Sequence, residues 1–321
     1  MKGLNILLGC DNLKSTGTGT FIYSLNNELL KRGHDVDIFT FNNGLIGSRL
    51  PNLITNISKN SKYDLLILSQ KNIVDEILKL NVSGFKIYVS LIVDNFDKKK
   101  FPNETGLLNE MNRVVTLSEE SQNKLQSNGV KSSVIFMGYD CNRFRPIEPI
   151  KKEKPRILSA VRGETANKMI KQACEILDLE FVSWLKPWDY VSKTEDGSVA
   201  DVEKWINKSD IVIGLGRVVY EAMACGRQPI IFDDRWYQGN LGDGIVTPDN
   251  IEKFREYNCS GRYSKRKFEV EDIVEEINLY NPTYWYRFRK FILENMNIVN
   301  ITNQYLDIWK EHTGITENDK V

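Results

Sequence analysis

A carboxylate lies about one turn inside a short helix that the sequence predicts after a glycine turn. Residues 209–233 read SDIVIGLGRVVYEAMACGRQPIIFD, which predicts a strand, the turn GLG, a helix beginning near Arg217, a glycine and a second strand. Such a turn places backbone amides and the positive end of a helix at the carboxyl edge of the sheet, where phosphate is favoured. Glu221 in this helix could accept two hydrogen bonds from the vicinal hydroxyls of a ribose. The alternative is a solvated helix glutamate.

A second glycine-containing loop follows the first predicted strand. Asn5 to Gly9 is an apolar run, and Asp11 to Thr20 (DNLKSTGTGT) leads into apolar residues at helical spacing. A loop of small residues at the carboxyl end of a strand, leading into a helix, offers amides to an anion. Gly17 and Gly19 would let a diphosphate or an acceptor approach closely; the alternative is a flexible turn.

Short apolar runs alternate with longer amphipathic segments, as in parallel sheets covered by crossover helices. The sequence therefore predicts an α/β fold with two Rossmann-like domains, since 321 residues are about twice a common domain size. Two such sheets facing each other would bind ligands in a cleft between their carboxyl strand ends. The expected strands are Asn5 to Gly9, Val36 to Phe41, Asp64 to Ser69, Lys86 to Val93, Arg113 to Leu117, Ser133 to Met137, Arg156 to Val161, Leu179 to Ser183, Asp210 to Ile213 and Pro229 to Asp233.

The segment Pro146 to Pro155 (PIEPIKKEKP) is rich in proline and charge and predicts a linker. We therefore expect an N-terminal acceptor-side domain over 1–148 and a donor domain over 149–290. Residues 291–321 are expected to form a C-terminal helix that crosses back, followed by a frayed tail. The aromatic and basic segment 284–297 admits a helix on a membrane surface, but packing across both domains is favoured.

Composition excludes several classes of protein. Lys and Arg together number 43 and so do Asp and Glu, so no global field directs the chain to nucleic acid or an anionic bilayer. The five cysteines are scattered and there are two histidines, which argues against a disulfide framework or a zinc site. Without a signal-peptide pattern or a long apolar stretch, a cytoplasmic protein is expected, with peripheral contact at the inner face of a membrane left open.

The segment 209–233 resembles the donor-binding signature of glycosyltransferase family 4, a family with the GT-B architecture. The matching residues are Gly214, Gly216, Glu221, Ala222, Met223, Ala224, Cys225, Gly226 and Pro229. The resemblance implies that Glu221 binds the ribose of the donor and that the amides around Gly216 and Arg217 face the donor. It also implies that Arg162 and Lys168, which match in type and spacing a cation pair of the family, clamp the donor diphosphate.

Two further stretches fit the same family in the same order. Residues 17–36, which end in RGHDV, resemble its N-terminal glycine loop and first helix. RVVTLS (113–118) and VIFMGYDCNRFRP (134–146) resemble the last strands of its N-terminal domain.

The sequence departs from the family pattern at two places. Ile213 occupies the position of a glutamate that touches the transferred sugar. Either another group supports the sugar hydroxyls, with Asp243 in the loop GNLGDG as the candidate, or the donor sugar differs from the common hexoses. A histidine common after the fourth strand is absent. Asp94 ends that strand here and is the candidate for acceptor contact or general base; the alternative is a cap of the next helix or turn.

The resemblance implies a retaining glycosyltransferase that uses a UDP- or GDP-sugar and no metal, because Arg162 and Lys168 can supply the charge. The only DxD motif, Asp35-Val36-Asp37, lies away from the donor segment. The expected acceptor is a glycan, a lipid-linked glycan or a protein in cell-envelope polysaccharide or glycoconjugate synthesis. The alternatives are a GT-B epimerase or phosphorylase, an inactive nucleotide-sugar-binding or scaffold protein, and a DNA-modifying glucosyltransferase; the neutral net charge argues against nucleic acid.

Overall fold

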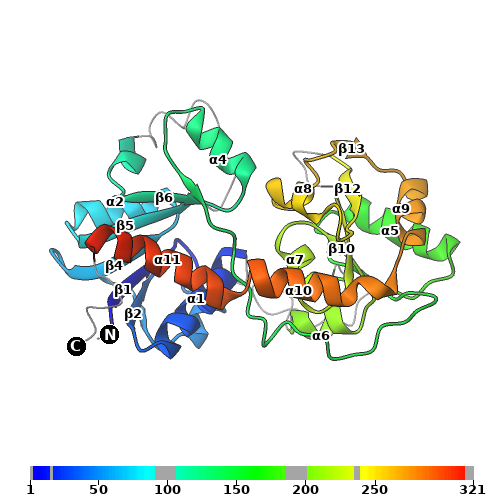
Figure 1. Ribbon diagram of the computed structural model, residues 1–321, viewed down its shortest axis with the longest axis horizontal. Helices are drawn as coiled ribbons and strands as arrows, with labels where there is room; N and C mark the ends of the chain where they lie inside the picture. The colour runs from blue at the N-terminus through cyan, green and yellow to red at the C-terminus, as the bar shows by residue number, and fades with distance from the viewer. Residues whose placement is uncertain (1–2, 15–16, 91–105, 185–200, 235–238, 315–321) are drawn as a thin grey trace. The chain divides into compact units, whose positions relative to one another are not determined.

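The chain folds into two compact α/β units. The computed structural model describes residues 3–14, 17–90, 106–184, 201–234 and 239–314. Unit 1 consists of Met1–Gly138 together with Ile298–Val321, and unit 2 of Tyr139–Asn297. Each is built on its own sheet with helices against it (Figure 1). The chain therefore passes between the units at 138–139 and 297–298, whereas the sequence analysis placed these boundaries at 148 and 290.

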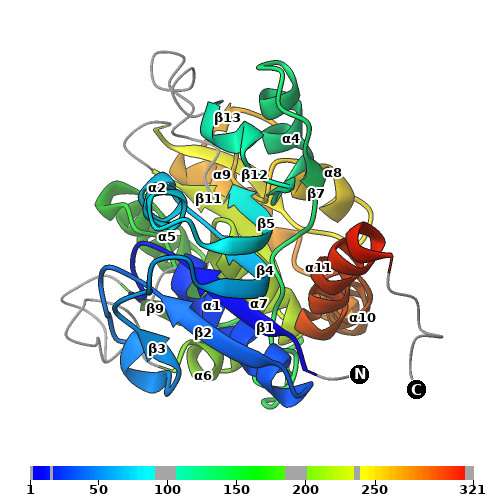
Figure 2. The ribbon, with the colours of Figure 1, turned by 90° about the vertical axis from the view of Figure 1, so that its left-hand side faces the viewer.

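Unit 1 is built on a seven-stranded sheet of order β3-β2-β1-β4-β5-β6-β7, in which every neighbouring pair is parallel. Figure 2 shows β2, β1, β4 and β5 side by side. The helices and strands are β1 (Asn5–Gly9), α1 (Gly17–Lys31), β2 (Asp35–Phe39), η1 (Gly47–Arg49), β3 (Leu53–Ile54), β4 (Lys62–Leu68), α2 (Lys71–Lys79), β5 (Ser83–Ser90), β6 (Arg113–Thr116), α4 (Glu119–Gln126), β7 (Ser133–Val134) and α11 (Ile298–Thr313). The six strands predicted for the first half are all present.

The ends of these helices follow from local sequence. Ser118 caps α4 by accepting a hydrogen bond from the amide of Ser121, and two glutamates in the first turn suit the helix dipole. Gly33 follows α1 with φ of +82°, a left-handed conformation that glycine adopts without strain. Gly33 thus marks the end of the first helix.

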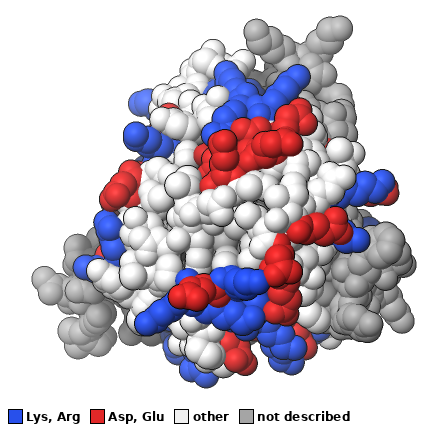
Figure 3. All heavy atoms as spheres, turned by 90° about the vertical axis from the view of Figure 1, so that its right-hand side faces the viewer, with Lys and Arg blue, Asp and Glu red and all other residues white. Residues whose placement is uncertain are grey.

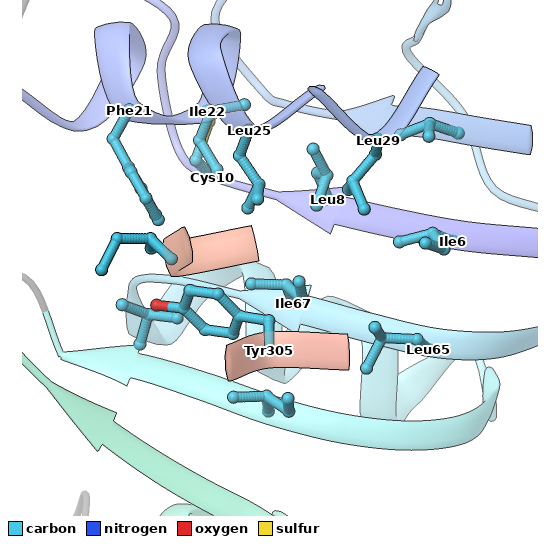
Figure 4. Packing of buried hydrophobic residues seen from close by; sticks show 14 of the residues in the cluster. Ile6, Leu8, Cys10, Phe21, Ile22, Leu25, Leu29, Leu65, Ile67 and Tyr305 are labelled. Carbon is cyan, nitrogen blue, oxygen red and sulfur yellow. The ribbon is translucent and has the colours of Figure 1, made fainter. Parts of the chain in front are cut away.

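The C-terminal helix α11 completes the core of unit 1. Its side chains Ile301, Tyr305 and Trp309 are buried in the same cluster as those of α1, β1 and β4. Figure 4 shows Phe21, Leu25 and Leu29 of α1 pointing toward the sheet, with Tyr305 alongside Ile67. The indole of Trp309 donates to the backbone oxygen of Asp64 at 3.0 Å. The helix thus belongs structurally to unit 1, although it is the last element in the chain.

Tyr305 provides a test of this packing. Its hydroxyl is buried and has no hydrogen-bond partner among the described residues. Because an unpaired buried hydroxyl costs about 1–3 kcal/mol, Tyr305→Phe is expected to raise the unfolding free energy of unit 1 by about 1 kcal/mol. Urea titration followed by circular dichroism measures this change.

The control for Tyr305→Phe is Tyr63→Phe, which should act in the opposite direction. The Tyr63 hydroxyl donates to Asp37 Oδ2 at 2.8 Å, so its removal breaks a bond that exists. Equal destabilisation by the two substitutions would contradict the packing described for α11.

Unit 2 is built on a six-stranded sheet of order β13-β12-β11-β10-β8-β9. The four strands predicted for the second half, here β8 to β11, are parallel, and β12 and β13 extend the edge in antiparallel pairing. The helices and strands are β8 (Ile157–Ser159), α5 (Glu164–Ile176), β9 (Phe181–Ser183), α6 (Val202–Asn207), β10 (Ile211–Gly214), α7 (Arg217–Ala224), β11 (Gln228–Asp233), β12 (Leu241–Ile245), α8 (Ile251–Glu256), β13 (Arg266–Lys267), α9 (Val270–Asn278), η2 (Pro282–Tyr284) and α10 (Trp285–Asn295).

The segment 146–155, predicted to be a linker, is anchored within unit 2. The amide of Ile147 donates to Asn207 Oδ1 at 2.8 Å, and that of Lys151 to Asp210 Oδ1 at 2.9 Å. The guanidinium of Arg227, fully buried, donates to the backbone oxygen of Glu148 at 2.6 Å. These long-range bonds make the segment part of unit 2 despite its prolines and charges.

Helix α10 packs on unit 2 through Phe288 and Ile292. Arg289 donates to the backbone oxygens of Cys141 at 2.7 Å and Ala224 at 2.9 Å, the latter at the end of α7. The aromatic and basic segment 284–297 therefore lies in unit 2, and α10 forms most of it. Among the described residues no helix is long and apolar enough to span a bilayer.

Candidate functional site

The sheet of unit 2 has a switch point between β8 and β10. The strand β8 comes first in the sequence and lies between β10 and β9, so the chain leaves it in both directions. In open α/β sheets, ligands bind outside the carboxyl strand ends at such a point. The turns that follow β8 and β10 touch there: the amide of Ala160 donates to Ile213 O at 2.8 Å, and a Cβ on Gly214 would lie 3.4 Å from the Cβ of Ala160.

Gly216 forms the turn between β10 and α7. Its φ of +62° and ψ of −122° are strained for any residue with a side chain. Its amide donates to Cys259 O at 2.8 Å. The amide is thus used inside unit 2, and the expectation that it faces a ligand is not met in this structure. The glycine fixes the direction in which α7 starts.

Glu221 and Arg217 form a buried ion pair on α7. Arg217 Nε donates to Glu221 Oε1 at 2.6 Å, and the guanidinium lies over the ring of Tyr139, 4.7 Å from its centroid. Glu221 is 7% exposed, which rules out the solvated helix glutamate considered above. Burial raises the pKa of Glu221, and the charge and hydrogen bond of Arg217 partly offset this rise. A ligand hydroxyl that binds Glu221 would share the carboxylate with Arg217.

Arg162 follows β8, in a turn held by a carboxylate that sequence reasoning missed. The amides of Arg162 and Gly163 donate to the two oxygens of Asp233 at 3.3 and 3.2 Å. Asp233 is 3% exposed and ends β11, so its position after a predicted strand was the available signal. The side chain of Arg162 is exposed at the carboxyl edge of the sheet. Asp233 thereby fixes the backbone from which this cation projects.

There is no room for a side chain at position 163 in this turn. A Cβ there would lie 0.9 Å from Asp234 Oδ1, whose residue follows β11. The carboxylate of Asp234 therefore sits against the start of α5, where the positive end of the helix favours negative charge.

Lys168 lies on α5 and pairs with Glu164 one turn earlier, with Nζ 3.0 Å from Oε1. The two side chains are 71% and 81% exposed, so the pair contributes little to stability and can reorganise around an anion. The structure thus places Lys168 on the helix that follows Arg162, in a solvated position.

Asp243 lies in the antiparallel strand β12 and not in a loop, which corrects the sequence analysis. Its Oδ1 accepts from the amide of Ser264 at 2.8 Å, while its Oδ2 is buried without a hydrogen-bond partner among the described residues. Burial raises its pKa, and hydrogen bonds from Ser264 partly offset the rise. Leu241 of the same strand pairs with Asp233, so Asp243 lies further from the carboxyl edge than expected.

The remaining predicted site residues belong to unit 1. Gly17 and Gly19 lie in the first turn of α1 and not in a loop, because the helix starts at Gly17. A Cβ on Gly19 would lie 2.2 Å from Lys14 O, so this glycine permits a close backbone approach. Asp94 lies outside the described residues. Within them, no group of three or more His, Cys, Asp or Glu side chains is placed to hold a metal ion.

Comparison with known proteins defines the fold. No protein-family model and no curated protein matches the sequence. Solved structures of similar fold include a glycosyltransferase from Rickettsia africae ESF-5, with 14% identity and a TM-score of 0.64 over 98% of this chain and 100% of that one. Sucrose-phosphate synthase from Thermosynechococcus elongatus has 12% identity to this chain and a TM-score of 0.61, over 97% of this chain and 99% of that one.

An alpha-glucosyltransferase solved with UDP and a 13-mer DNA containing an HMU base also has this fold, with 12% identity and a TM-score of 0.59 over 96% of this chain and 100% of its own. The chain therefore has the α/β fold with two parallel-sheet domains of GT-B glycosyltransferases. Identities this low establish the fold alone, and membership of family 4 stays a prediction.

Proposed function

We propose that this chain is a retaining glycosyltransferase that moves a sugar from a UDP- or GDP-sugar to a hydroxyl of a glycan, lipid-linked or protein acceptor. The observation that carries the proposal is the buried carboxylate of Glu221, one turn inside α7 next to the switch point of unit 2. Burial raises the pKa of its carboxyl group, and Arg217 offsets this rise only in part, so further hydrogen-bond donors would favour the carboxylate. A pair of ribose hydroxyls would satisfy it.

The proposed roles of the other residues follow from their charges. Arg162 lies in the turn after β8 and Lys168 on α5, the helix that follows. Both are cations, and they would stabilise the diphosphate as it leaves with increased negative charge. We propose that Asp243 binds hydroxyls of the transferred sugar. Asp94 is proposed to contact the acceptor. Arg217 would hold the Glu221 carboxylate in place. Gly17 and Gly19 would let the donor or acceptor approach the start of α1.

The proposed reaction keeps the configuration of the sugar. The bond between the anomeric carbon and the diphosphate oxygen breaks, the acceptor oxygen bonds to that carbon on the same face, and the acceptor proton passes to the departing phosphate. No enzyme nucleophile is then required. We propose that the transfer does not need a metal, because Arg162 and Lys168 supply positive charge.

Assay of a donor labelled in the sugar tests this proposal. Incubation with EDTA should still give release of nucleoside diphosphate, and the product should have the anomeric configuration of the donor. Activity that EDTA abolishes and Mg²⁺ or Mn²⁺ restores would refute metal independence, and an inverted product would refute retention.

The second candidate is a nucleotide-sugar-binding protein without activity. Ile213, at the position where the resembled family has a glutamate, is fully buried in β10, and its apolar side chain cannot hydrogen-bond a sugar hydroxyl. Donor binding without turnover over hours would favour this candidate. A DNA acceptor is less well supported. On the face shown in Figure 3, Lys and Arg side chains lie beside Asp and Glu side chains, and this face lacks the continuous positive charge that attracts duplex DNA.

Lys168 gives a specific test of the proposed diphosphate contacts. Lys168→Ala is expected to lower kcat/KM for the donor about 10-fold, which corresponds to about 1.4 kcal/mol of transition-state stabilisation. Lys171→Ala is the matched control, because Lys171 lies on the same helix and also pairs with a glutamate one turn away. Steady-state kinetics should separate the two variants, and equal effects would remove Lys168 from the site.

A further inference from the structure

The sheet of unit 1 also has a switch point, between β1 and β4. The strand β1 lies between β2 and β4, and the chain extends the sheet from it in both directions. The carboxyl ends of β1 and β4 are in register at Gly9 and Leu68. The residues that follow are polar: Asp11 after β1, and Ser69 and Gln70 after β4. Ligands of open α/β sheets bind at this position.

These polar residues are tied to one another. The amide of Asp11 donates to Gln70 Oε1 at 2.7 Å, and Asn72 Nδ2 donates to Asp11 Oδ2 at 3.3 Å. Ser69 is held to the end of β1, its amide donating to Gly9 O at 2.8 Å. The backbone of Asp11 is thus held by the residue that follows β4, and its carboxylate by Asn72 in the first turn of α2.

The other oxygen of the Asp11 carboxylate stands apart from these contacts. Asp11 Oδ1 is buried and has no hydrogen-bond partner among the described residues. Burial raises the pKa of Asp11, while the hydrogen bond from Asn72 lowers it. Buried polar atoms are nearly always hydrogen-bonded in native proteins, so this oxygen needs a partner that the described chain does not supply.

The backbone is strained at Gln70, whose side-chain oxygen accepts from the amide of Asp11. Gln70 has φ of +69° and ψ of 141°, outside the regions that residues with side chains adopt readily. Such a conformation costs about 1–3 kcal/mol and persists where the surroundings require it, often at ligand sites. Here it presents the side-chain oxygen of Gln70 to the amide of Asp11.

We propose that Asp11 and Asn72, held in place by Gln70, bind a polyhydroxy ligand at the switch point of unit 1. Asp11 Oδ1 accepts a hydrogen bond from one hydroxyl, and the amide of Asn72 offers a donor and an acceptor to a neighbouring hydroxyl. That this ligand is the sugar-bearing acceptor of the transfer reaction rests on the proposed function. The site itself does not involve the donor residues of unit 2.

Saturation-transfer NMR of the full-length protein with methyl glycosides of glucose, galactose, mannose and N-acetylglucosamine tests the site. At least one glycoside should bind the wild type, and Asp11→Asn and Asn72→Ala should each weaken that binding at least 10-fold. Asp64→Asn is the control, because Asp64 joins the opposite ends of the same two strands by accepting from the amide of Asn5 at 2.8 Å. Its binding should equal that of the wild type.

The outcomes separate this site from the proposed function. Thermal stabilisation by the nucleotide sugar should be the same in Asp11→Asn and wild type, which also shows that the variant is folded. Absence of glycoside binding to the wild type, or equal binding by Asp11→Asn, would overturn the proposed site. A lack of stabilisation by any nucleotide sugar, with glycoside binding still dependent on Asp11, would instead refute the donor assignment.

Discussion

Replacing Glu221 by alanine is expected to raise the dissociation constant of the nucleotide-sugar donor at least 100-fold. A buried carboxylate that accepts two hydroxyl hydrogen bonds loses both, and each bond to a charged group contributes about 1.5–3 kcal/mol. The sum is about 3 kcal/mol or more, which corresponds to two or more factors of ten. Isothermal titration calorimetry of the wild type and Glu221→Ala measures this difference.

A matched control is needed because loss of Glu221 also leaves Arg217 without its ion pair. Glu276 of α9 is likewise 7% exposed, and it accepts from the amide of Ile245 and from Arg266, each at 2.6 Å. Glu276→Gln should lower stability and leave donor affinity unchanged. An affinity of Glu221→Ala within a few-fold of the wild type, under conditions where both are folded, would remove Glu221 from the donor site.

The pH dependence of donor binding follows from the same carboxylate. Burial raises the pKa of Glu221, and Arg217 lowers it only in part. Because the pKa of Glu221 is higher in the folded protein than in the unfolded chain, protonation of Glu221 stabilises the folded state. This contribution is fully present below the ordinary glutamate pKa and is lost as pH rises through the raised value. The ribose hydroxyls bind the ionised carboxylate more strongly than the protonated form, so the affinity for the nucleotide sugar should increase with pH over that same window. Glu221→Gln should bind more weakly and lose this pH dependence.

Asp210→Asn is expected to destabilise unit 2 by about 3–5 kcal/mol, because breaking a buried ion pair leaves uncompensated charge. The Asp210 side chain has no exposed surface and accepts from Arg156 Nε at 2.8 Å and from the amides of Arg156 and Lys151 at 2.8 and 2.9 Å. Its loss would leave Arg156 and the buried Arg227 without their shared counter-charge. Urea or thermal unfolding monitored for unit 2 measures the effect.

Asp178→Asn is the corresponding exposed control. Asp178 pairs with Lys154 from a side chain that is 89% exposed, so the unfolding midpoint should not change. If Asp210→Asn also left the unfolding midpoint unchanged, the segment 146–155 would not be held as the structure indicates.

Acid should reproduce the effect of Asp210→Asn in the wild type. Burial alone would raise the pKa of Asp210, but hydrogen bonds from Arg156 and from the amides of Arg156 and Lys151 outweigh it and lower the pKa. A lowered folded-state pKa gives stability that is present above the ordinary aspartate value of about 3.9 and is lost as pH falls through the folded value. Asp210→Asn should therefore flatten the stability profile of unit 2 below about pH 4.

The alternation of apolar runs predicted ten of the eleven parallel strands in the described part of the chain, because strands buried on both faces need continuous apolar sequence. The eleventh, β3, has only two residues and was not predicted. The edge strand β12 was missed, since its sequence LGDGI has two glycines and an aspartate and forms a strand only by pairing with β11. The start of α1 was placed too late because Gly17 and Gly19 disfavour helix. Burial of Phe21, Leu25 and Leu29 on the other turns of α1 overrides that propensity.

The candidate site was predictable only in part. Glu221 was found through a local motif and pairs with Arg217 one turn earlier on the same helix, but the contact of Arg217 with Tyr139 joins distant parts of the sequence. The anchoring of 146–155 could not be predicted either, because Arg227 and Asp210 carry no signal of their partners. Asp11 and Gln70 directly follow two strands, which was a usable signal, but the sheet order that makes those strands neighbours was not known.

The central claim is that unit 2 binds a nucleotide sugar, and a thermal-shift screen of the wild type with UDP-, GDP- and ADP-sugars in EDTA tests it most directly. Ligand at about 100 times its dissociation constant adds about 2.7 kcal/mol, which for a unit of this size raises the melting temperature by about 5 °C or more. We predict such a rise with one nucleotide class and none with Glu221→Ala. No rise with any nucleotide sugar would contradict the account.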